Sequence, residues 1–341
     1  MSDLPMKRMK SAHGDKVLLD RPKAAPEQVH VFGQHEIDAI DAALAARRPL
    51  LVRGEPGIGK SQLAQAAAVD LGRAYVQHVV DSRTESRDLL WHFDAVARLA
   101  DAQLKGALRE ANEECRTELH RELAVENYLH PRALWWAFDW ESARKQAIKA
   151  RRPDVPPQLP GCDPQNGCVV LIDEIDKAET DVPNGLLEAL GAGRFTPQGL
   201  TEPVMATGEP PLVMITTNEE RALPDAFIRR CLVLHLRLPD RDDELIEHLV
   251  KRAEAHFDAA DPDLLRKAAE LLVQDRRKAE QERWLPLPGQ AEYLDLVRAV
   301  LDLGSDPKQQ QDLLAQVSRY VLKKHPGYET NSPSPLGRGL G

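Results

Sequence analysis

Uninterrupted apolar runs and helical patterns alternate along the first two thirds of the chain. The apolar runs predict short buried strands at 49–53, 74–80, 168–173, 212–217 and 232–236. Apolar residues spaced by three or four positions predict helices at 34–47, 61–71 and 183–190, and a glycine-rich stretch predicts a hairpin at 191–208. Because strands without polar alternation, separated by helices, are typical of parallel sheets covered on both faces, this pattern predicts an α/β fold.

Two regions depart from this alternation. Between about 95 and 165, apolar residues from Leu104 to Leu123 recur every three or four positions. This spacing predicts one long amphipathic helix with its charges on a solvated face, and we interpret the region as a helical insertion between two strands. After Pro239 only helical spacing remains, which predicts an all-helical domain.

The predicted organisation has four parts. Residues 1–30 are polar and lack periodicity, which is typical of a flexible arm. Residues 31–238 form the α/β core with its insertion at about 95–165, and 239–326 form a helical lid. The end of the chain, 327–341, is rich in Ser, Pro and Gly, so we expect a disordered tail there.

The charge balance argues against a general nucleic-acid binder. Lys and Arg number 45 against 54 Asp and Glu, a net charge of −9, whereas broad phosphate-binding surfaces are basic. A content of 42% apolar and 29% charged residues is typical of a globular protein. No apolar run approaches the roughly 18 residues of a membrane span, the first ten residues lack the apolar core of a secretory signal, and the four cysteines are scattered. We therefore expect a cytoplasmic protein.

The octet Gly54-Glu-Pro-Gly-Ile-Gly-Lys60-Ser61 fits the phosphate-loop pattern G-x-x-x-x-G-K-[ST] in full. Glycines let the backbone curl so that successive N–H groups face phosphates, and the helix that follows offers its positive N-terminal end. In this pattern Lys60 reaches the β- and γ-phosphates, and the Ser61 hydroxyl ligates Mg²⁺. A predicted strand precedes the motif and a predicted helix follows it, which favours a nucleotide site over a plain turn.

Two carboxylates follow a buried strand further along the chain. Val169 to Ile172 form the apolar strand, and Asp173 and Glu174 come at its carboxyl end, where open α/β sheets bind ligands. We expect Asp173 to complete the Mg²⁺ shell and Glu174 to polarise the attacking water.

Together, Gly54–Ser61 and Asp173-Glu174-Ile-Asp176 resemble the Walker A and Walker B motifs of AAA+ ATPases. The resemblance implies a P-loop NTPase parallel-sheet sandwich with a C-terminal helical lid, which binds ATP and Mg²⁺. It implies that Asn218, in Ile215-Thr-Thr-Asn218, is the sensor 1 residue near the γ-phosphate. It also implies an arginine finger that completes the neighbouring subunit's site.

The implied catalytic residues are Lys60, Glu174, Asn218, Arg229 and Arg230, with either arginine as the finger. The implied nucleotide-binding residues are Gly54, Glu55, Pro56, Gly57, Ile58, Gly59, Lys60, Ser61, Gln62 and Asp173, of which Ser61 and Asp173 hold Mg²⁺.

The segment Leu223-Pro-Asp-Ala-Phe-Ile-Arg229-Arg230, the insertion and the lid resemble the MoxR branch of AAA+ proteins, over about residues 30 to 325. That branch implies a hexameric ATP-driven chaperone that remodels or matures a protein client, often with a von Willebrand factor A domain partner. Two features depart from it. Pro286–Glu292 contains no basic residue for sensor 2, which leaves Arg283 and Arg298 as candidates. The insertion is unlike any element of assigned role, and we expect it to be partner-binding or pore-facing.

Three functions remain open on the sequence alone. The first is Mg²⁺-dependent ATP hydrolysis at subunit interfaces, coupled to remodelling of a protein client. The second is a nucleotide-gated assembly scaffold with little turnover, which the missing sensor 2 residue favours. The third is an NTP-driven nucleic-acid translocase or restriction subunit, which the acidic balance and the lack of an Asn-Lys-x-Asp guanine-binding motif disfavour.

Overall fold

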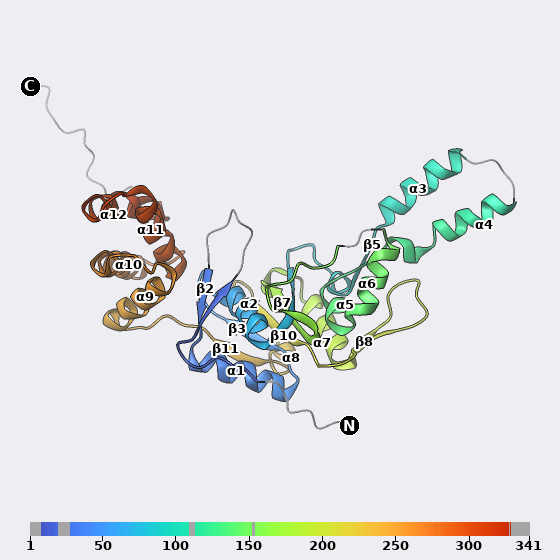
Figure 1. The fold of residues 1–341 in the computed structure, drawn as a ribbon, viewed down its shortest axis with the longest axis horizontal. Coiled ribbons are helices and arrows are strands. Elements are labelled where there is room, and N and C mark those ends of the chain that lie inside the picture. The colour runs from blue at the N-terminus through green and yellow to red at the C-terminus, as the bar shows by residue number, and fades with distance from the viewer. Residues whose placement is uncertain (1–7, 20–27, 109–112, 152–153, 327, 329–341) are drawn as a thin grey trace, which may run out of the picture. The chain divides into compact units, whose positions relative to one another are not determined.

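A five-stranded parallel sheet forms the core of the first part of the computed structural model, which describes residues 8–19, 28–108, 113–151, 154–326 and 328 (Figure 1). The strand order is β11-β3-β10-β7-β4. Every pairing within this sheet is parallel, so the predicted α/β fold is confirmed. The strands are β3 (Leu50–Arg53), β4 (Arg73–Val79), β7 (Asp163–Asp173), β10 (Leu212–Thr217) and β11 (Leu232–His235).

Helices pack on the sheet through its alternating side chains. α1 (Gln34–Ala46) contacts β3 and β11, and α2 (Lys60–Leu71) contacts β4 and β7. Alternate residues of β4 and β7 share a hydrophobic cluster with α5 (Ala133–Phe138) and α7 (Asp181–Ala192). The chain between α7 and β10 contains β8 (Arg194–Phe195) and β9 (Val204–Met205), which pair antiparallel as the predicted hairpin. Further short helices of this part are η1 (Ser86–Leu89), η3 (Ile175–Lys177) and α8 (Asp225–Ile228).

The N-terminal segment corrects the prediction of a flexible arm over 1–30. β1 (Lys16–Leu19) pairs antiparallel with β2 (Gln28–Val31). The backbone amides of Lys10 and Ser11 donate to the Asp70 carboxylate at 2.6 and 2.9 Å. The sequence pattern misses this order for two reasons. Strands of four residues are too short to show a clear alternation of apolar and polar positions, and the Asp70 carboxylate that holds residues 10–11 lies on α2, far along the chain. Residues 1–7 and 20–27 of the predicted arm lie outside the described residues.

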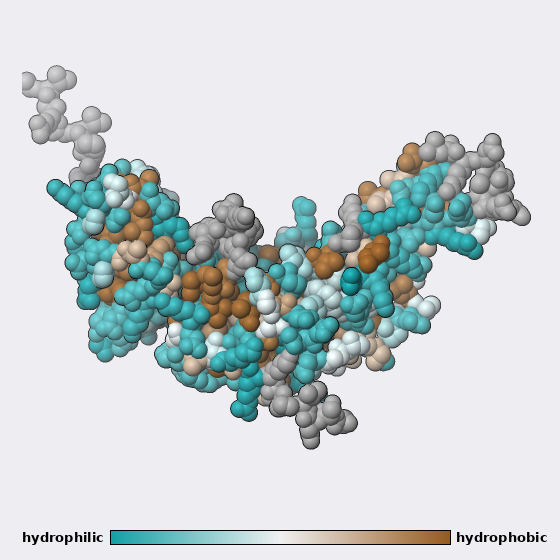
Figure 2. All heavy atoms as spheres, in the orientation of Figure 1, coloured by the Kyte–Doolittle hydropathy of each residue, from teal (hydrophilic) through white to brown (hydrophobic). Residues whose placement is uncertain are grey.

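The insertion contains two helices where the spacing of apolar residues predicts one long helix. α3 spans Ala95–Leu108 and α4 spans Glu113–Glu122, and the two form a hairpin; residues 109–112 lie outside the described residues (Figure 1). Lys105 and Glu122 form an ion pair with an N–O distance of 3.0 Å, so these two charges face each other and not solvent. Hydrophobic residues reach the surface where α3 lies (Figure 2).

The rest of the insertion packs into the core. β5 (Trp91–Phe93) pairs antiparallel with β6 (Leu129–Pro131), and η2 (Val125–Tyr128) and α6 (Trp140–Lys149) flank them. Trp135 and Trp136 are 1% and 3% exposed, so both tryptophans belong to the hydrophobic core.

Among the described residues, 55–59 and those from 236 onward form a second compact unit, and those up to 54 and from 60 to 235 form the first. The helices of the second unit are α9 (Asp242–His256), α10 (Pro262–Glu282), α11 (Gln290–Leu303) and α12 (Pro307–Val321). Their apolar faces share one hydrophobic cluster, so the predicted all-helical C-terminal region is confirmed. Of the predicted tail, only Tyr328 belongs to the described residues. Among the described helices, none combines the length and apolarity that crossing a bilayer requires.

Candidate functional site

The predicted site residues of the first unit lie at the carboxyl ends of neighbouring strands. β10 pairs with β3 on one side and with β7 on the other, so Arg53, Asp173 and Thr217 end adjacent strands. Ligands of open α/β sheets bind at this edge. α2 begins at Lys60, so its positive N-terminal end comes directly after the glycine-rich loop.

Lys60 is held in place before any ligand is considered. Its side chain is 7% exposed, and its ammonium donates to the backbone oxygen of Gly54 and to the amide oxygen of Asn218, both at 2.7 Å. A buried ammonium must keep such partners, because leaving it unpaired is costly. The structure therefore brings together Gly54 at the end of β3, Lys60 on α2 and Asn218 after β10.

Ser61 and Asp173 lie next to each other, as the sequence predicts. The Ser61 hydroxyl donates to both carboxylate oxygens of Asp173, at 3.0 and 2.9 Å. Asp173 also accepts hydrogen bonds from the Thr216 hydroxyl and, at 3.3 Å, from the Gln77 amide. Hydroxyl and carboxylate oxygens are the hard ligands that Mg²⁺ prefers, so this pair fits the predicted metal site.

Glu174 adopts a backbone conformation that residues other than glycine seldom take. Its φ is 61°, in the left-handed region, and its amide donates to the Thr216 hydroxyl at 2.9 Å. Strain of this kind persists where surrounding contacts enforce it, often at functional sites. The Glu174 carboxylate accepts a 2.6 Å hydrogen bond from Lys177, which raises the pKa of Lys177, and a longer one of 3.4 Å from the Asn218 amide.

Asp176 fixes the loop that follows β10. This residue is buried, with only 2% of its surface exposed. Its carboxylate accepts hydrogen bonds from the backbone amides of Asn218 at 3.4 Å and Glu220 at 2.9 Å. Because both bonds constrain the turn that carries Asn218, Asp176 orients the predicted sensor 1 side chain toward Lys60 and Glu174.

Arg229 and Arg230 follow α8 and do not join this cluster. Both side chains are exposed, and within the described residues neither guanidinium donates a hydrogen bond. Arg48 instead donates to the backbone oxygens of Arg229, Arg230 and Cys231, with distances of 3.1 Å to Arg230 and 3.3 Å to Cys231. The backbone of this segment is therefore ordered while its two guanidinium groups are presented to solvent.

The middle of the glycine-rich loop, residues 55–59, belongs to the second unit. Glu55 receives two hydrogen bonds from the Arg276 guanidinium on α10, at 2.9 and 2.7 Å. Arg276 is 7% exposed and donates also to the Pro288 backbone oxygen at 2.9 Å. Gly57 has a φ of 77°, and a Cβ placed there would come within 2.8 Å of the Ala291 Cβ, so only glycine fits. Pro56 is exposed, while Ile58, Gly59 and, at the start of α2, Gln62 are half-buried.

Several contacting residues escape sequence reasoning. Gln77 and Thr216 bind Asp173, Lys177 binds Glu174, and Arg276 binds Glu55. Thr216 lies two positions before Asn218 and Lys177 three positions after Glu174, so distance along the chain from a motif could have flagged these two. Arg276 is the residue that touches the loop, whereas Arg298 pairs with Asp295 on its own helix.

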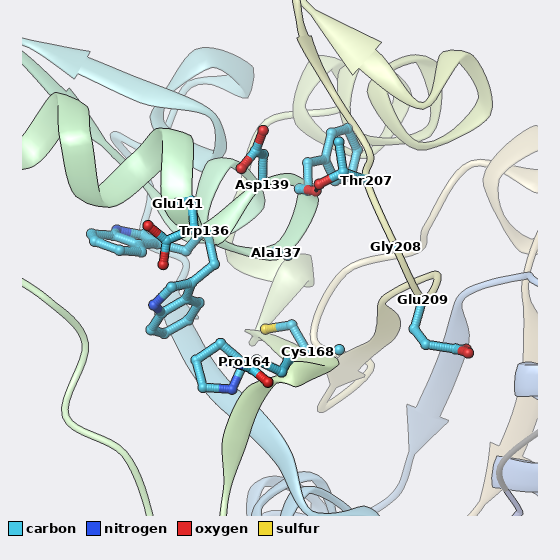
Figure 3. Close-up of a pocket in the computed structure, with 13 residues that line it drawn as sticks. Trp136, Ala137, Asp139, Glu141, Pro164, Cys168, Thr207, Gly208 and Glu209 are labelled. Carbon is cyan, nitrogen blue, oxygen red and sulfur yellow. Dashed lines mark hydrogen bonds between the residues drawn. The ribbon is translucent and has the colours of Figure 1, made fainter.

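A separate cavity of about 230 Å³ lies toward the amino end of β7 (Figure 3). The α5–α6 junction, the start of β7 and the segment after β9 line it, with Trp136, Asp139, Glu141, Cys168 and Glu209 among the side chains. At about 3.3 Å per residue, Cys168 and Asp173 are roughly 16 Å apart along the strand, so this cavity is distinct from the Lys60 cluster. None of the predicted site residues lines it.

Comparisons with known proteins identify the family. The model of the AAA domain (dynein-related subfamily) matches residues 49–252, more than half of the chain. Among curated proteins the sequence has no match.

Three solved structures of RuvB from Thermotoga maritima, one described as a Holliday junction branch migration motor and two as mutants, are similar in fold. The first mutant is 15% identical to this chain with a TM-score of 0.42. The comparison covers 84% of this chain and 68% of the RuvB chain. The branch migration motor is 16% identical with a TM-score of 0.40, and the second mutant is 15% identical with a TM-score of 0.41; both comparisons cover 84% of this chain and 66% of the other. Because the family model spans more than half of the sequence, this protein belongs to the AAA domain family, dynein-related subfamily, and is an ATP-hydrolysing P-loop enzyme.

Proposed function

We propose that this ATPase cleaves the γ-phosphate of ATP with Mg²⁺ at the Lys60 cluster. The observation that carries the proposal is the single hydrogen-bonded cluster that joins Lys60 to Asn218 and Ser61 to Asp173. Gly54 to Gln62 hold the phosphates through backbone amides, except for Pro56, which has no N–H, and Lys60 binds the β- and γ-phosphate oxygens. Ser61 and Asp173 are the residues that hold Mg²⁺, which supplies charge neutralisation of the phosphates when bound.

Glu174 is the proposed general base. Its carboxylate follows the metal-binding Asp173 directly, and the Asn218 amide reaches it at 3.4 Å. In this role Glu174 accepts a proton from the attacking water and Asn218 orients the carboxylate and the γ-phosphate. Lys177 donates a hydrogen bond to the same carboxylate at 2.6 Å, so one of its oxygens is occupied in this arrangement.

A neighbouring subunit completes the site in this proposal. Arg229 and Arg230 are exposed, and among the described residues neither side chain binds the Lys60 cluster of its own subunit, while Arg48 orders their backbone. These features support an arginine finger that acts in trans within a ring, for which we propose six subunits. A finger of this kind stabilises the charge of the transition state.

The wider function follows from the resemblance to the MoxR branch. We infer a cytoplasmic chaperone-like machine that remodels or matures a protein client together with a von Willebrand factor A domain partner. In it the core of 31–238 and the lid of 239–326 are the moving parts, and hydrolysis releases the arrangement that ATP holds closed. The net charge of −9 disfavours nucleic acid as the client.

Replacement of the proposed base tests the mechanism. Glu174→Gln keeps the shape of the side chain but removes the proton acceptor, so ATP binding stays within about threefold while turnover falls by roughly 10²–10⁴-fold. Glu188→Gln, on the exposed side of α7, is the matched control and keeps full turnover. Unchanged hydrolysis in Glu174→Gln contradicts the assigned base.

Mixing of variants tests the shared site. Subunits with Arg229→Ala and Arg230→Ala keep their own phosphate loop, and Lys60→Ala subunits keep their arginines. Mixed rings therefore contain some complete interfaces, and we expect activity at intermediate ratios that neither variant shows alone. Strict inactivity at every ratio argues against a finger in trans.

A nucleotide-gated scaffold with little turnover is the second candidate. The ion pair between Glu174 and Lys177 favours it, because a paired carboxylate holds the water-activating group in an unreactive state. The two functions differ in one assay: a scaffold assembles its complex equally well with wild-type protein and with Glu174→Gln, whereas an ATP-driven chaperone stalls with the variant.

A further inference from the structure

Arg48 is held at the junction between α1 and β3. Its backbone amide donates to the Ala43 oxygen at 3.2 Å, across the last turn of α1. The residue before it, Arg47, has a φ of 52°, and a helix end of this form is a compact and well-defined stop. The residue after it, Pro49, accepts a hydrogen bond from the Leu232 amide at 2.9 Å. The base of the Arg48 side chain is therefore fixed next to the start of β11.

The Arg48 guanidinium binds the turn that follows α8. It donates to the backbone oxygens of Arg229, Arg230 and Cys231, at 3.1 Å to Arg230 and 3.3 Å to Cys231. The last carbonyl oxygens of a helix lack partners inside the helix and carry partial negative charge, so a cation that binds several of them stabilises the helix end. Arginine suits this task because its planar guanidinium offers five donors in a fixed arrangement. One side chain therefore holds the backbone of both proposed finger residues.

Helix α8 needs this external support. It has four residues, too few for its own hydrogen bonds to fix the turn after it. Phe227 anchors one side of it in the core of the first unit, where this residue is fully buried. The exposed side continues into Arg229 and Arg230, whose backbone is bound by Arg48. Arg48 is itself a poor candidate for the finger, because reaching a neighbouring subunit would break these bonds.

We propose that Arg48 is a positioning residue, which fixes the direction in which Arg229 and Arg230 leave their own subunit. The inference rests on the proposed action of these two arginines in trans. In the part of the chain that the structure describes, the Arg48 side chain donates no hydrogen bond to the Lys60 cluster, so its effect falls on the neighbour's site. Misplacement of a catalytic group by about 1 Å costs up to roughly 10²-fold in rate, so the backbone of a finger must be held firmly.

Replacement of Arg48 tests the kinetic consequence. Arg48→Met keeps the length of the side chain and removes its donors, so kcat falls by roughly 10–10²-fold while ATP affinity stays within about twofold. Arg48→Lys keeps a cation with three donors but loses the planar fork, so it recovers part of the rate. Arg47→Met, at the exposed arginine one position earlier, is the matched control and keeps wild-type kcat. Wild-type turnover in Arg48→Met overturns the proposal.

Mixing of subunits separates a positioning role from general structural damage. Arg48→Met subunits keep their own nucleotide site, so they regain activity with Lys60→Ala subunits, which supply positioned fingers. They gain none with subunits that carry both Arg229→Ala and Arg230→Ala, because both partners then lack a working finger. If Arg48→Met damages its own nucleotide site, the pattern reverses: it stays inactive with Lys60→Ala and regains activity with the finger variant. The reversed pattern overturns the proposal.

A further mixture distinguishes failure of this inference from failure of the proposed function. Subunits that carry Arg229→Ala and Arg230→Ala, mixed with Lys60→Ala subunits, test the finger without any change at Arg48. If this mixture is active and that of Arg48→Met with Lys60→Ala is not, the finger stands and Arg48 does not position it. If neither mixture is active, the finger in trans and this inference both fail. Far-UV circular dichroism confirms that each variant keeps its helices.

Discussion

The ammonium of Lys60 and the amide oxygen of Asn218 are 2.7 Å apart, although 158 positions separate them in the sequence. One residue begins α2 and the other follows β10, and the parallel pairing of β10 with β3 brings them to the same edge of the sheet. This contact fixes the cation of the phosphate loop before nucleotide arrives, which reduces the reorganisation that the reaction requires.

Removal of the Asn218 amide is expected to slow the chemical step. Asn218→Ala takes a preorganised polar group from Lys60 and Glu174, and loss of one such group costs roughly 10²–10³ in kcat. Asn184→Ala on α7, whose amide contacts only the Thr180 backbone oxygen in the described structure, is the matched control and keeps wild-type kcat. Single-turnover hydrolysis measures the effect, and equal rates in both variants exclude a role for Asn218 in chemistry.

Loss of the ion pair between Lys177 and Glu174 is expected to raise basal turnover. Both side chains are partly exposed, at 41% and 31%, so the pair is weak and its loss increases turnover by roughly fivefold at most. Lys177→Met removes the charge and keeps the length of the side chain, whereas Lys177→Arg keeps the pair and the wild-type rate. Steady-state ATPase assays compare the three proteins. A drop in turnover for Lys177→Met indicates that the lysine belongs to the active arrangement.

Arg276 is expected to stabilise the second unit more than any of its exposed arginines. Its buried guanidinium binds Glu55 twice, Glu280 and the Pro288 backbone oxygen. The partner Glu55 is 44% exposed and regains water when the guanidinium is removed, so Arg276→Ala lowers the unfolding free energy by about 2 kcal/mol, through the lost charge-assisted hydrogen bonds.

Arg298→Ala is the control for this prediction. Arg298 pairs with the exposed Asp295, and an exposed pair contributes about 1 kcal/mol or less. Urea-induced unfolding followed by circular dichroism measures both variants. If Arg276→Ala loses less unfolding free energy than Arg298→Ala does, the contact with Glu55 does not stabilise the unit as predicted.

His78 is expected to make the fold less stable in acid. Burial first, and the charge of Arg132 second, lower the pKa of His78 below its ordinary value of 6.5, and its buried Nε2 has no hydrogen-bond partner among the described residues. The unfolded chain therefore binds the proton more readily than the folded one. The contribution of His78 to stability is complete above pH 6.5 and is lost as pH falls through the lowered pKa.

Urea unfolding at pH 5.5 and pH 7.5, on the order of one unit either side of the ordinary histidine pKa, measures this dependence. His78→Asn is neutral at both values, so its unfolding free energy changes less between them than that of wild type. His13→Asn replaces an exposed histidine and keeps the wild-type difference. Identical pH dependence in wild type and His78→Asn removes His78 as its source.

Local signals in the sequence were sufficient for the fold class and for the first elements of the site. The phosphate loop is one contiguous octet, and its chemistry depends on adjacent backbone amides, so its residues are readable without a fold. The apolar strands before Gly54, Asp173 and Asn218 can be predicted in the same way, because each is a run of adjacent apolar residues. Their common parallel direction follows from the helices between them, which places all three strand ends at one edge.

The contacts that Gln77 and Thr216 make in the site depend on the order of the strands and on the direction of their side chains. Gln77 reaches Asp173 because β4 pairs with β7, and Thr216 reaches Asp173 and the Glu174 amide because β10 pairs with β7. Nothing in the spacing of these residues along the chain determines those pairings. The single predicted insertion helix fails for a related reason: periodicity records which residues share a face, and not where the chain turns.

By itself, then, the sequence determined an α/β fold, a phosphate loop and two acidic residues after a buried strand, because these features depend on residues that are close along the chain. Tertiary structure alone decided that Arg276 contacts Glu55, and that α3 exposes Val96 and Leu99 while its charged side chains are only half-exposed. Periodicity identifies an amphipathic helix, but which face meets the protein is set by the partners that folding brings to it.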